Sequence, residues 1–240
     1  HDNQSTAGAS TTAAATPPWF IDIVDGDAST DVGQYVSVAI DPRNDRAYIS
    51  YYDATNGDLR VAKHVESGGN CGPGNSWSCE TVDSAGDVGK FTSIAIYTST
   101  NPLTWKVGVS YYDADNYALK YAQYGWSQPL QTHKWTTYII HGGSAISTYG
   151  QHTSLEFDST GTPHIFYYRS VPSPLGDDAL MYAHKVSSGG NCGPSGNWEC
   201  GVVDAGDNVG QYTSLFIAWS DIPEVFYHDG GSNRLKIAIP

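Results

Sequence analysis

Short runs of alternating apolar and polar residues fill the chain from about residue 19 onward. The run "YVSVAI", which starts at Tyr35, is one example, and turns rich in Gly, Asn, Asp and Pro, such as "DPRND" and "ATNGD", separate it from the next. Alternation with a period of two predicts β-strands. No long stretch has the i, i+3, i+4, i+7 apolar spacing of an amphipathic helix. We therefore expect an all-β protein of short antiparallel strands.

The pattern of strands repeats four times. The strings "DVGQYVSVAID", "DVGKFTSIAIY", "TYGQHTSLEFD" and "NVGQYTSLFIA" align on Gly33, Gly89, Gly150 and Gly210, at steps of 56, 61 and 60 residues. After each string come a run such as "YISYYD" and a run such as "LRVAKHV", and three repeats then carry a fourth run that begins at a Trp. Four strands in a repeat of this length is typical of a propeller blade.

The fourth repeat ends after its third run, and a matching fourth run, "WFIDIVD", occurs near the start of the chain at Trp19. We therefore predict a four-bladed β-propeller whose N-terminal strand closes the last blade and leaves no sheet edge exposed. The expected blades span about residues 32–83, 88–141, 149–204, and 209–240 together with 19–25. Residues 1–18, rich in Ala, Thr and Ser, are expected to form a flexible or extended arm.

The charge balance excludes some partners. With 12 Lys and Arg against 25 Asp and Glu, the formal net charge is −13. Binding to nucleic acid requires cationic side chains that neutralise phosphates, and docking on anionic lipid has the same requirement. No apolar run approaches the length of a membrane span. We expect neither nucleic-acid binding nor membrane insertion.

The four cysteines lie in two similar strings, "NCGPGNSWSC" and "NCGPSGNWEC". Seven residues separate the cysteines of each string, which suits a bridge across a hairpin, so we predict the disulfides Cys71–Cys79 and Cys192–Cys200. Zinc is the alternative, but neither a CxxC pair nor a suitably spaced His is present. Disulfides indicate an oxidising, extracellular location. Because no signal peptide is visible, the sequence is expected to start after its cleavage.

The combined motifs "VGQYTSL", "SYYD" and "LKYA" resemble a repeat of secreted and cell-surface bacterial β-propeller proteins. The resemblance covers residues 19–240 and implies the propeller fold and a place outside the cell. It does not specify an activity, because propellers include both enzymes and binding proteins. The pattern is distantly reminiscent of sialidase-like propellers, but their Asp box, Ser-x-Asp-x-Gly-x-Thr-Trp, is absent from this chain.

The chain lacks the common local signatures of catalysis and nucleotide binding, including GxSxG, HExxH, GxxxxGK[ST] and GxGxxG. Asp residues recur in the turns and could bind Ca²⁺ through their carboxylates. The alternative, which we favour, is that they cap tight turns by accepting hydrogen bonds from backbone N–H groups. The candidate Ca²⁺ ligands are Asp53, Asp58, Asp113 and Asp115.

The third repeat departs from the other three. His152 replaces an aromatic residue, Glu156 stands among small apolar equivalents, and Arg169 replaces the Asp of "YYD". Pairing of the first two strands is expected to place Arg169 opposite His152 or Gln151. These departures predict either a polar ligand site or a structural ion pair. The ligand-binding candidates are Tyr52, Tyr112, His152, Glu156, Tyr167, Tyr168 and Arg169.

These patterns favour a non-catalytic extracellular module that binds a glycan or a protein. It could also build a surface layer or filament by contacting copies of itself through the N-terminal arm. The alternative is an enzyme similar to glycoside hydrolases, with carboxylates near the propeller axis, of which Glu156 would be one. No catalytic residue is assigned.

Overall fold

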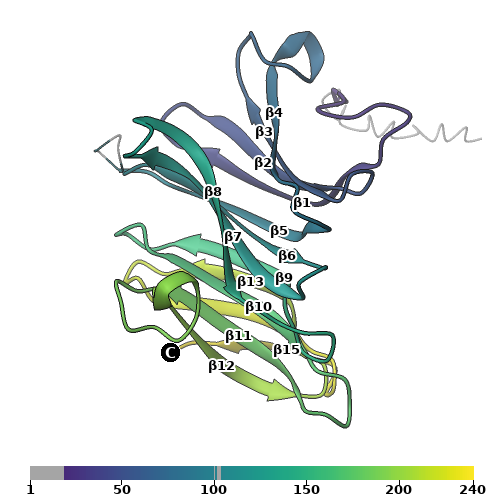
Figure 1. Ribbon diagram of the computed structural model, residues 1–240, viewed down its shortest axis with the longest axis vertical. Coiled ribbons are helices and arrows are strands. Elements are labelled where there is room, and N and C mark those ends of the chain that lie inside the picture. Colours follow the sequence, from purple (N-terminus) through teal and green to yellow (C-terminus); the bar gives the residue numbers. More distant parts are fainter. Residues whose placement is uncertain (1–18, 100, 102–103) are drawn as a thin grey trace, which may run out of the picture.

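The computed structural model describes residues 19–99, 101 and 104–240. The protein is an all-β, four-bladed β-propeller with almost no helix (Figure 1). The first blade contains β1 (Val32–Asp41), β2 (Arg46–Asp53), β3 (Asp58–His64) and β4 (Trp77–Asp83). The second contains β5 (Val88–Tyr97), β6 (Lys106–Asp113), β7 (Ala118–Ser127) and β8 (Thr132–His141). The third contains β9 (Thr148–Phe157), β10 (Pro163–Ser170), β11 (Asp178–Lys185) and β12 (Trp198–Gly206), and the fourth contains β13 (Val209–Ile217), β14 (Pro223–Asp229) and β15 (Arg234–Ala238).

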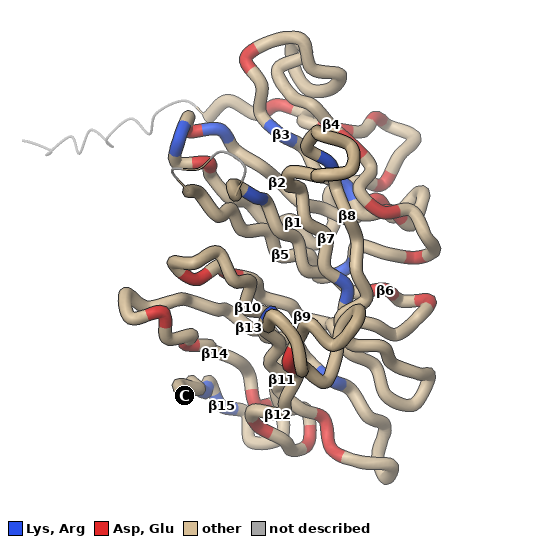
Figure 2. Tube along the Cα trace, turned by 60° about the vertical axis from the view of Figure 1, so that its left-hand side comes forward, with Lys and Arg blue, Asp and Glu red and all other residues tan. Residues whose placement is uncertain are grey.

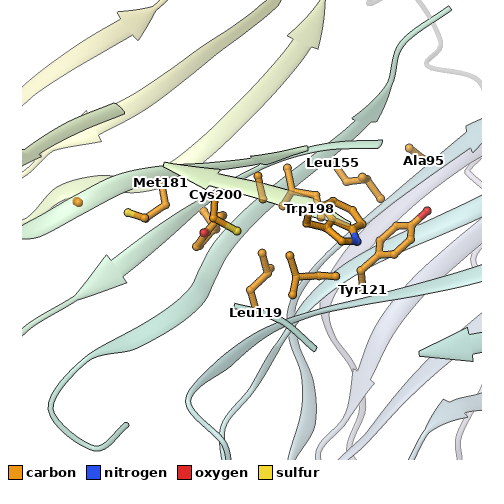
Figure 3. Packing of buried hydrophobic residues seen from close by; sticks show 12 residues of the cluster. Ala95, Leu119, Tyr121, Leu155, Met181, Trp198 and Cys200 are labelled. Carbon is orange, nitrogen blue, oxygen red and sulfur yellow. The ribbon is translucent and has the colours of Figure 1, made fainter. Parts of the chain in front are cut away.

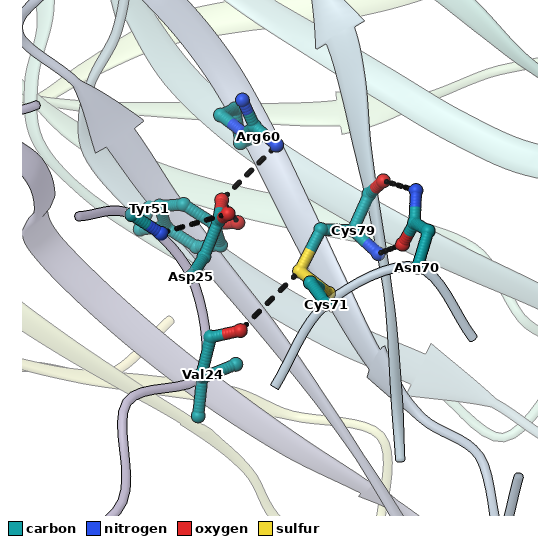
Figure 4. Close-up of a disulfide and its surroundings, with 8 residues drawn as sticks. Val24, Asp25, Tyr51, Arg60, Asn70, Cys71 and Cys79 are labelled. Atoms are coloured by element: carbon teal, nitrogen blue, oxygen red, sulfur yellow. Dashed lines mark hydrogen bonds and ion pairs between the residues drawn. A yellow bond between two sulfur atoms is a disulfide. The ribbon is translucent and has the colours of Figure 1, made fainter. Parts of the chain in front are cut away.

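The first three blades are four-stranded antiparallel meanders, and the fourth is a sheet of three strands in the order β13-β14-β15. The predicted closing strand is therefore wrong: residues 19–25 form no strand and do not join β15. The segment lies instead beside the first blade, where Asp25 accepts a hydrogen bond from Tyr51 and forms an ion pair with Arg60 (Figure 4). The predicted arm, residues 1–18, lies outside the described residues.

The innermost strands of neighbouring blades pack against one another, β1 on β5, β5 on β9 and β9 on β13. Each carries an aromatic ring at a β-bulge whose φ is positive: Tyr35 (54°), Phe91 (56°), His152 (52°) and Tyr212 (53°). The rings form a column across the blades, with centroid separations of 4.6, 4.6 and 4.4 Å. His152 is thus one member of this column.

A Thr that follows each of the last three rings, and a Ser that lies two residues after each of the first three, join the blades by hydrogen bonds. Thr92 donates to the carbonyl of Tyr35 at 2.9 Å, and Ser37 accepts from the backbone N–H of Ile94 at 3.2 Å. The same two bonds recur at the next two blade boundaries, through Thr153 and Ser93, and then Thr213 and Ser154. The "VGQYTSL" motif therefore serves to attach one blade to the next.

The hydrophobic core lies between blades. The largest cluster joins residues of the second and third blades, including Leu119, Tyr121, Leu155 and Trp198 (Figure 3). The rings of Tyr121 and Trp198 meet edge to face at 5.4 Å, and both side chains are almost completely buried. Burial of such large apolar surfaces supplies most of the stabilisation of a sheet-on-sheet contact.

Both predicted disulfides are confirmed, Cys71–Cys79 and Cys192–Cys200. In the first loop the side chain of Asn70 both donates to the carbonyl of Cys79, at 2.9 Å, and accepts from its N–H, at 2.7 Å (Figure 4). Asn191 makes the same pair of bonds with Cys200. The repeated Asn explains why both strings begin "NC", and the two bridges indicate an oxidising environment.

Acidic residues lie mainly in the turns and at the ends of the strands (Figure 2). Among the described residues there is no helix long and apolar enough to cross a membrane.

Candidate functional site

The first Tyr of the "YYD" motif links each blade to the segment before it. Tyr51, Tyr111 and Tyr227 donate to the carboxylates of Asp25, Asp83 and Asp204, at 2.5, 2.6 and 2.6 Å. A cation on the third strand of the blade pairs with the same carboxylate in each case: Arg60 with Asp25, Lys120 with Asp83, and Lys236 with Asp204. These tyrosines are buried, so they join blades and are not available to a ligand.

The third blade makes this link without a carboxylate. Tyr167 bonds to Nδ1 of His141 at 2.7 Å, and Met181 takes the place of the cation. Burial, with the charge of Arg169 nearby, lowers the pKa of His141 to about 4, so its imidazole is neutral at neutral pH. The neutral His and the Met replace a charged pair together, which keeps the boundary between blades electrically balanced. Tyr167 therefore has a structural role.

Arg169 does not pair with His152 or Gln151 as predicted. The bulge at His152 shifts the register, so Tyr168 lies opposite Gln151 and Arg169 lies opposite Tyr149. The guanidinium donates to the carbonyl of Asp177 at 2.8 Å. Burial lowers the pKa of His152 to about 4, which leaves it neutral within the aromatic column. His152 and Arg169 thus do not form a shared polar site.

The second Tyr of each motif is also engaged within the fold. Tyr52 donates to Asp87 at 2.7 Å and Tyr168 donates to Asp178 at 2.6 Å, while Tyr112 packs its edge against Phe91. All three side chains are buried. Burial, followed by the hydrogen bond to Asp178, raises the pKa of Tyr168 to about 12.

The candidate Ca²⁺ ligands are used in turns. Asp53 accepts from the N–H groups of Thr55 and Asn56, and Asp113 accepts from that of Asn116. Asp115 accepts from the N–H of Asp87 across the blade boundary, and burial raises the pKa of Asp58. Within the described part of the chain, no group of three or more His, Cys, Asp and Glu side chains is placed to hold a metal ion.

Glu156 is different, because it lines an open groove of about 700 Å³ between the second, third and fourth blades. Tyr97 at the end of β5, Phe216 in β13, and Trp219 in the turn before β14 supply its aromatic walls. The Trp219 side chain is fully exposed. We call this feature the Glu156–Trp219 groove.

The carboxylates in this groove differ in their surroundings. Glu156 is exposed to solvent, but the surrounding groove walls partly desolvate its carboxyl and raise its pKa, an effect opposed only by a hydrogen bond from the N–H of Phe157. Burial also acts against ionisation of Asp158, but hydrogen bonds from Thr162, Thr160 and His164 outweigh it and lower its pKa. Asp221 accepts from the N–H and hydroxyl of Ser159, at 2.8 and 2.6 Å, and so joins two hairpins.

The groove therefore combines exposed aromatic faces with one carboxyl group that is little used by the fold. Lys106 contacts two rings that line the groove, with Nζ 5.4 Å from the centre of the Tyr97 ring and 5.5 Å from that of Phe157. An aromatic wall and a few directed polar groups suit a ligand that has both apolar faces and hydroxyl groups.

Sequence reasoning identified Glu156 but missed Tyr97 and Trp219. A signal for them exists in the turn after the innermost strand. The first and third repeats have Asp41 and Asp158 at that point, whereas the second has Tyr97 and the fourth has Ala218 followed by Trp219. Aromatic residues at the place of a turn-capping Asp indicate a surface adapted for contact.

No family model and no curated protein matches this chain. Among solved structures, an endo-arabinase from Bacteroides thetaiotaomicron is similar at 10% identity, covering 86% of this chain and 92% of that one, with a TM-score of 0.32. A GH43 endo-arabinanase from Bacillus licheniformis is similar at 11% identity, with 86% and 93% covered and a TM-score of 0.29. A fucose-specific lectin from Aleuria aurantia is similar at 10% identity, with 91% and 98% covered and a TM-score of 0.23. At these scores the similarity tells nothing about what the present chain binds.

Proposed function

We propose that the protein is a non-catalytic carbohydrate-binding module of the extracellular space or cell surface, and that it holds its ligand in the Glu156–Trp219 groove. The observation that carries this proposal is the fully exposed Trp219 ring beside a carboxyl group in an open groove of about 700 Å³. A sugar ring presents C–H groups that stack on an aromatic face, and hydroxyl groups that donate to a carboxylate.

The balance of charge and exposure supports a sugar over a peptide as the ligand. Glu156, Asp158 and Asp221 line the groove, so an anionic ligand would be repelled. Their oxygens accept hydrogen bonds, which matches a ligand rich in hydroxyl donors. A groove that is open to solvent also suits an extended glycan chain of which only a few units are held.

A glycan screen followed by titration calorimetry tests this proposal. We expect the wild-type chain to bind a neutral oligosaccharide, and Trp219→Ala to weaken binding about tenfold or more, since a lost stacking contact of about 1.4 kcal/mol has that effect. Trp126→Ala is the matched control, because Trp126 is partly exposed but lies outside the groove and should leave affinity unchanged. If no glycan binds, or if Trp219→Ala binds as well as the wild type, the proposal is wrong.

A glycoside hydrolase is the second candidate, and one observation favours it. Glu156 and Asp158 line the same groove with pKa values displaced in opposite directions, which is the arrangement in which one carboxyl donates a proton and the other stays ionised. If this candidate is right, the protein releases reducing ends from a polysaccharide, and Glu156→Gln and Asp158→Asn each abolish that release. Binding without any release of reducing ends would reject it and leave the binding module intact.

A further inference from the structure

Two sheet faces of the propeller are open. One belongs to the first blade and contains Val38, and we call it the first-blade face; the other belongs to the fourth blade and contains Leu235, and we call it the last-blade face. Together they correspond to the two sides of one blade boundary. On the first blade, Val36, Val38 and Ile40 are 60%, 60% and 53% exposed, although Ile94, Leu155 and Leu215, the equivalents of Val38, are buried by a preceding blade. On the last blade, Phe226 is 43% exposed, whereas its equivalent in the third blade, Phe166, is covered by the fourth.

A leucine on the third strand and a glycine on the next innermost strand approach each other closely at each of the three blade boundaries. A methyl group added to Gly89, Gly150 or Gly210 would lie 2.7, 2.6 or 2.6 Å from the Cα of Leu59, Leu119 or Leu180. These three leucines are completely buried, but the fourth, Leu235, is 78% exposed. Gly33, the first of the four glycines, has no atom within 4 Å of the corresponding position.

The inter-blade hydrogen bonds stop at the same two places. Ser37, Ser93 and Ser154 each accept from the following blade, and the described residues give Ser214 no such donor. At the other end, the residue equivalent to Thr92, Thr153 and Thr213 is Val36, which has no hydroxyl group to donate. On the last blade, Ser214 is thus an acceptor whose donor would come from a following blade. On the first blade, Val36 offers an apolar side chain where the other blades have a Thr hydroxyl.

Residues 19–25 complete the correspondence. Asp25 binds Tyr51 and Arg60 in the way that Asp83, at the end of an outermost strand, binds Tyr111 and Lys120 of the next blade (Figure 4). The segment therefore holds the position of an outermost strand that has no sheet of its own. Trp19, Phe20 and Ile21 are 85%, 90% and 91% exposed, and β15 is the edge of a sheet with one strand fewer than the others.

The arrangement of the blades bears on what covers these faces. The repeated contacts fix the step from each blade to the next, and three such steps do not bring β13 back to β1: the described residues show no packing between these two strands comparable to that between neighbouring blades. In Figure 1 the first blade lies at the top and the second below it, while the third and fourth overlap in the lower half. A second copy placed by one more such step would cover the last-blade face of the first copy with its own first-blade face.

We propose that copies of this chain associate head to tail across the open faces. Leu235 of one copy packs against Gly33 of the next, Ser214 accepts from the backbone N–H of Val38, and residues 19–23 of the second copy add to β15 as its fourth strand. Such a contact uses different surfaces on the two copies, so it propagates into a closed ring or a filament. This association does not depend on the Glu156–Trp219 groove or on residues 1–18.

Mixing two variants tests the proposal. Leu235→Asp blocks the last-blade face and Val38→Asp blocks the first-blade face; both side chains are exposed, so neither substitution should prevent folding, which near-ultraviolet circular dichroism checks. By sedimentation velocity we expect the wild type to associate and each variant alone to have the mass of one chain. An equimolar mixture should form a one-to-one pair, because each variant keeps the face that the other has lost.

Leu130→Asp is the matched control, because Leu130 is 59% exposed and lies in the turn between β7 and β8, outside both faces. This variant should associate like the wild type. If the variants fail to fold, Val36→Lys and Ile237→Lys, also at exposed positions, repeat the test. A wild-type chain that keeps the mass of one molecule at all concentrations would overturn the proposal. So would folded variants that stay single in the mixture, which is the result expected if the two faces close on each other within one chain.

Discussion

At the scale of single residues, the third blade shows how a buried charge can be replaced without loss of the contact it serves. In the second blade, Asp83 binds Lys120 at 2.5 Å and Tyr111 at 2.6 Å, with the Asp83 and Lys120 side chains 7% and 8% exposed. The third blade keeps the Tyr but substitutes His141 and Met181. The change removes one negative and one positive charge together, so no buried charge is left without a partner.

We predict that Asp83→His and Lys120→Met each lower the free energy of unfolding by about 3–5 kcal/mol, because each removes one charge of a buried ion pair. The double variant Asp83→His with Lys120→Met copies the third blade and should lose clearly less than the sum of the single changes. Urea unfolding followed by Trp fluorescence measures all three. Strict additivity would show that the pair is not coupled.

The Asp83–Lys120 pair also predicts how the stability of the fold depends on pH. Burial opposes ionisation of Asp83, but hydrogen bonds from Lys120 and Tyr111 outweigh it and hold its pKa below the ordinary value near 4. A lowered pKa in the folded state contributes stability that is present above the unfolded pKa and is lost as the pH falls through the folded value. We expect stability to decline below about pH 4, with a shallower decline in Asp83→Asn. Identical slopes in wild type and variant would contradict this role.

Residue types alone identified the departures of the third repeat but not what they do. His152 is part of the ring column and His141 is part of a blade boundary, and the register of Arg169 depends on a bulge that periodicity does not reveal. Glu156 was found because a carboxyl among apolar equivalents requires an explanation. Trp219 was missed because the turns were interpreted only as caps.

At the scale of elements, fifteen of the sixteen strands that the repeat predicts are present among the described residues, and so are both disulfide hairpins. The alternation of apolar and polar residues is enough for this, since the pleat has a period of two. It is not enough for the register of β9 on β10, which the bulge shifts. It also cannot place residues 19–25, because a strand needs a neighbouring strand to pair with.

The glycine at the start of each innermost strand gives a matched pair of substitutions. Gly33 and Gly150 both have positive φ, 94° and 106°, so Ala is strained at either position by about 1–3 kcal/mol. At Gly150 the added methyl would also lie 2.6 Å from the Cα of Leu119, whereas within a single chain no atom lies within 4 Å of a methyl added at Gly33. We predict that Gly150→Ala lowers the unfolding midpoint in urea well below that of Gly33→Ala. Equal midpoints would mean that the close approach of the blades at Gly150 does not contribute to stability.

At the scale of the whole molecule, the four blades share one type of boundary, and the chain contains three complete examples of it with the two halves of a fourth. Leu235 and Gly33 are those halves, together with a three-stranded last blade and a segment, residues 19–25, that lies beside the first blade in the place of an outermost strand. The Glu156–Trp219 groove lies between blades of a single copy. An assembled protein would therefore present one groove per copy, and several weak glycan contacts would act together.

The most direct test of the head-to-tail contact is the solution mass by light scattering over a range of concentrations, for the full chain and for residues 19–240. One chain has a mass of 25.8 kDa. We predict that both forms reach multiples of the single-chain mass as concentration rises, because the contact uses the open blade faces and not the first 18 residues. A mass of one chain for both forms at every concentration would contradict the account.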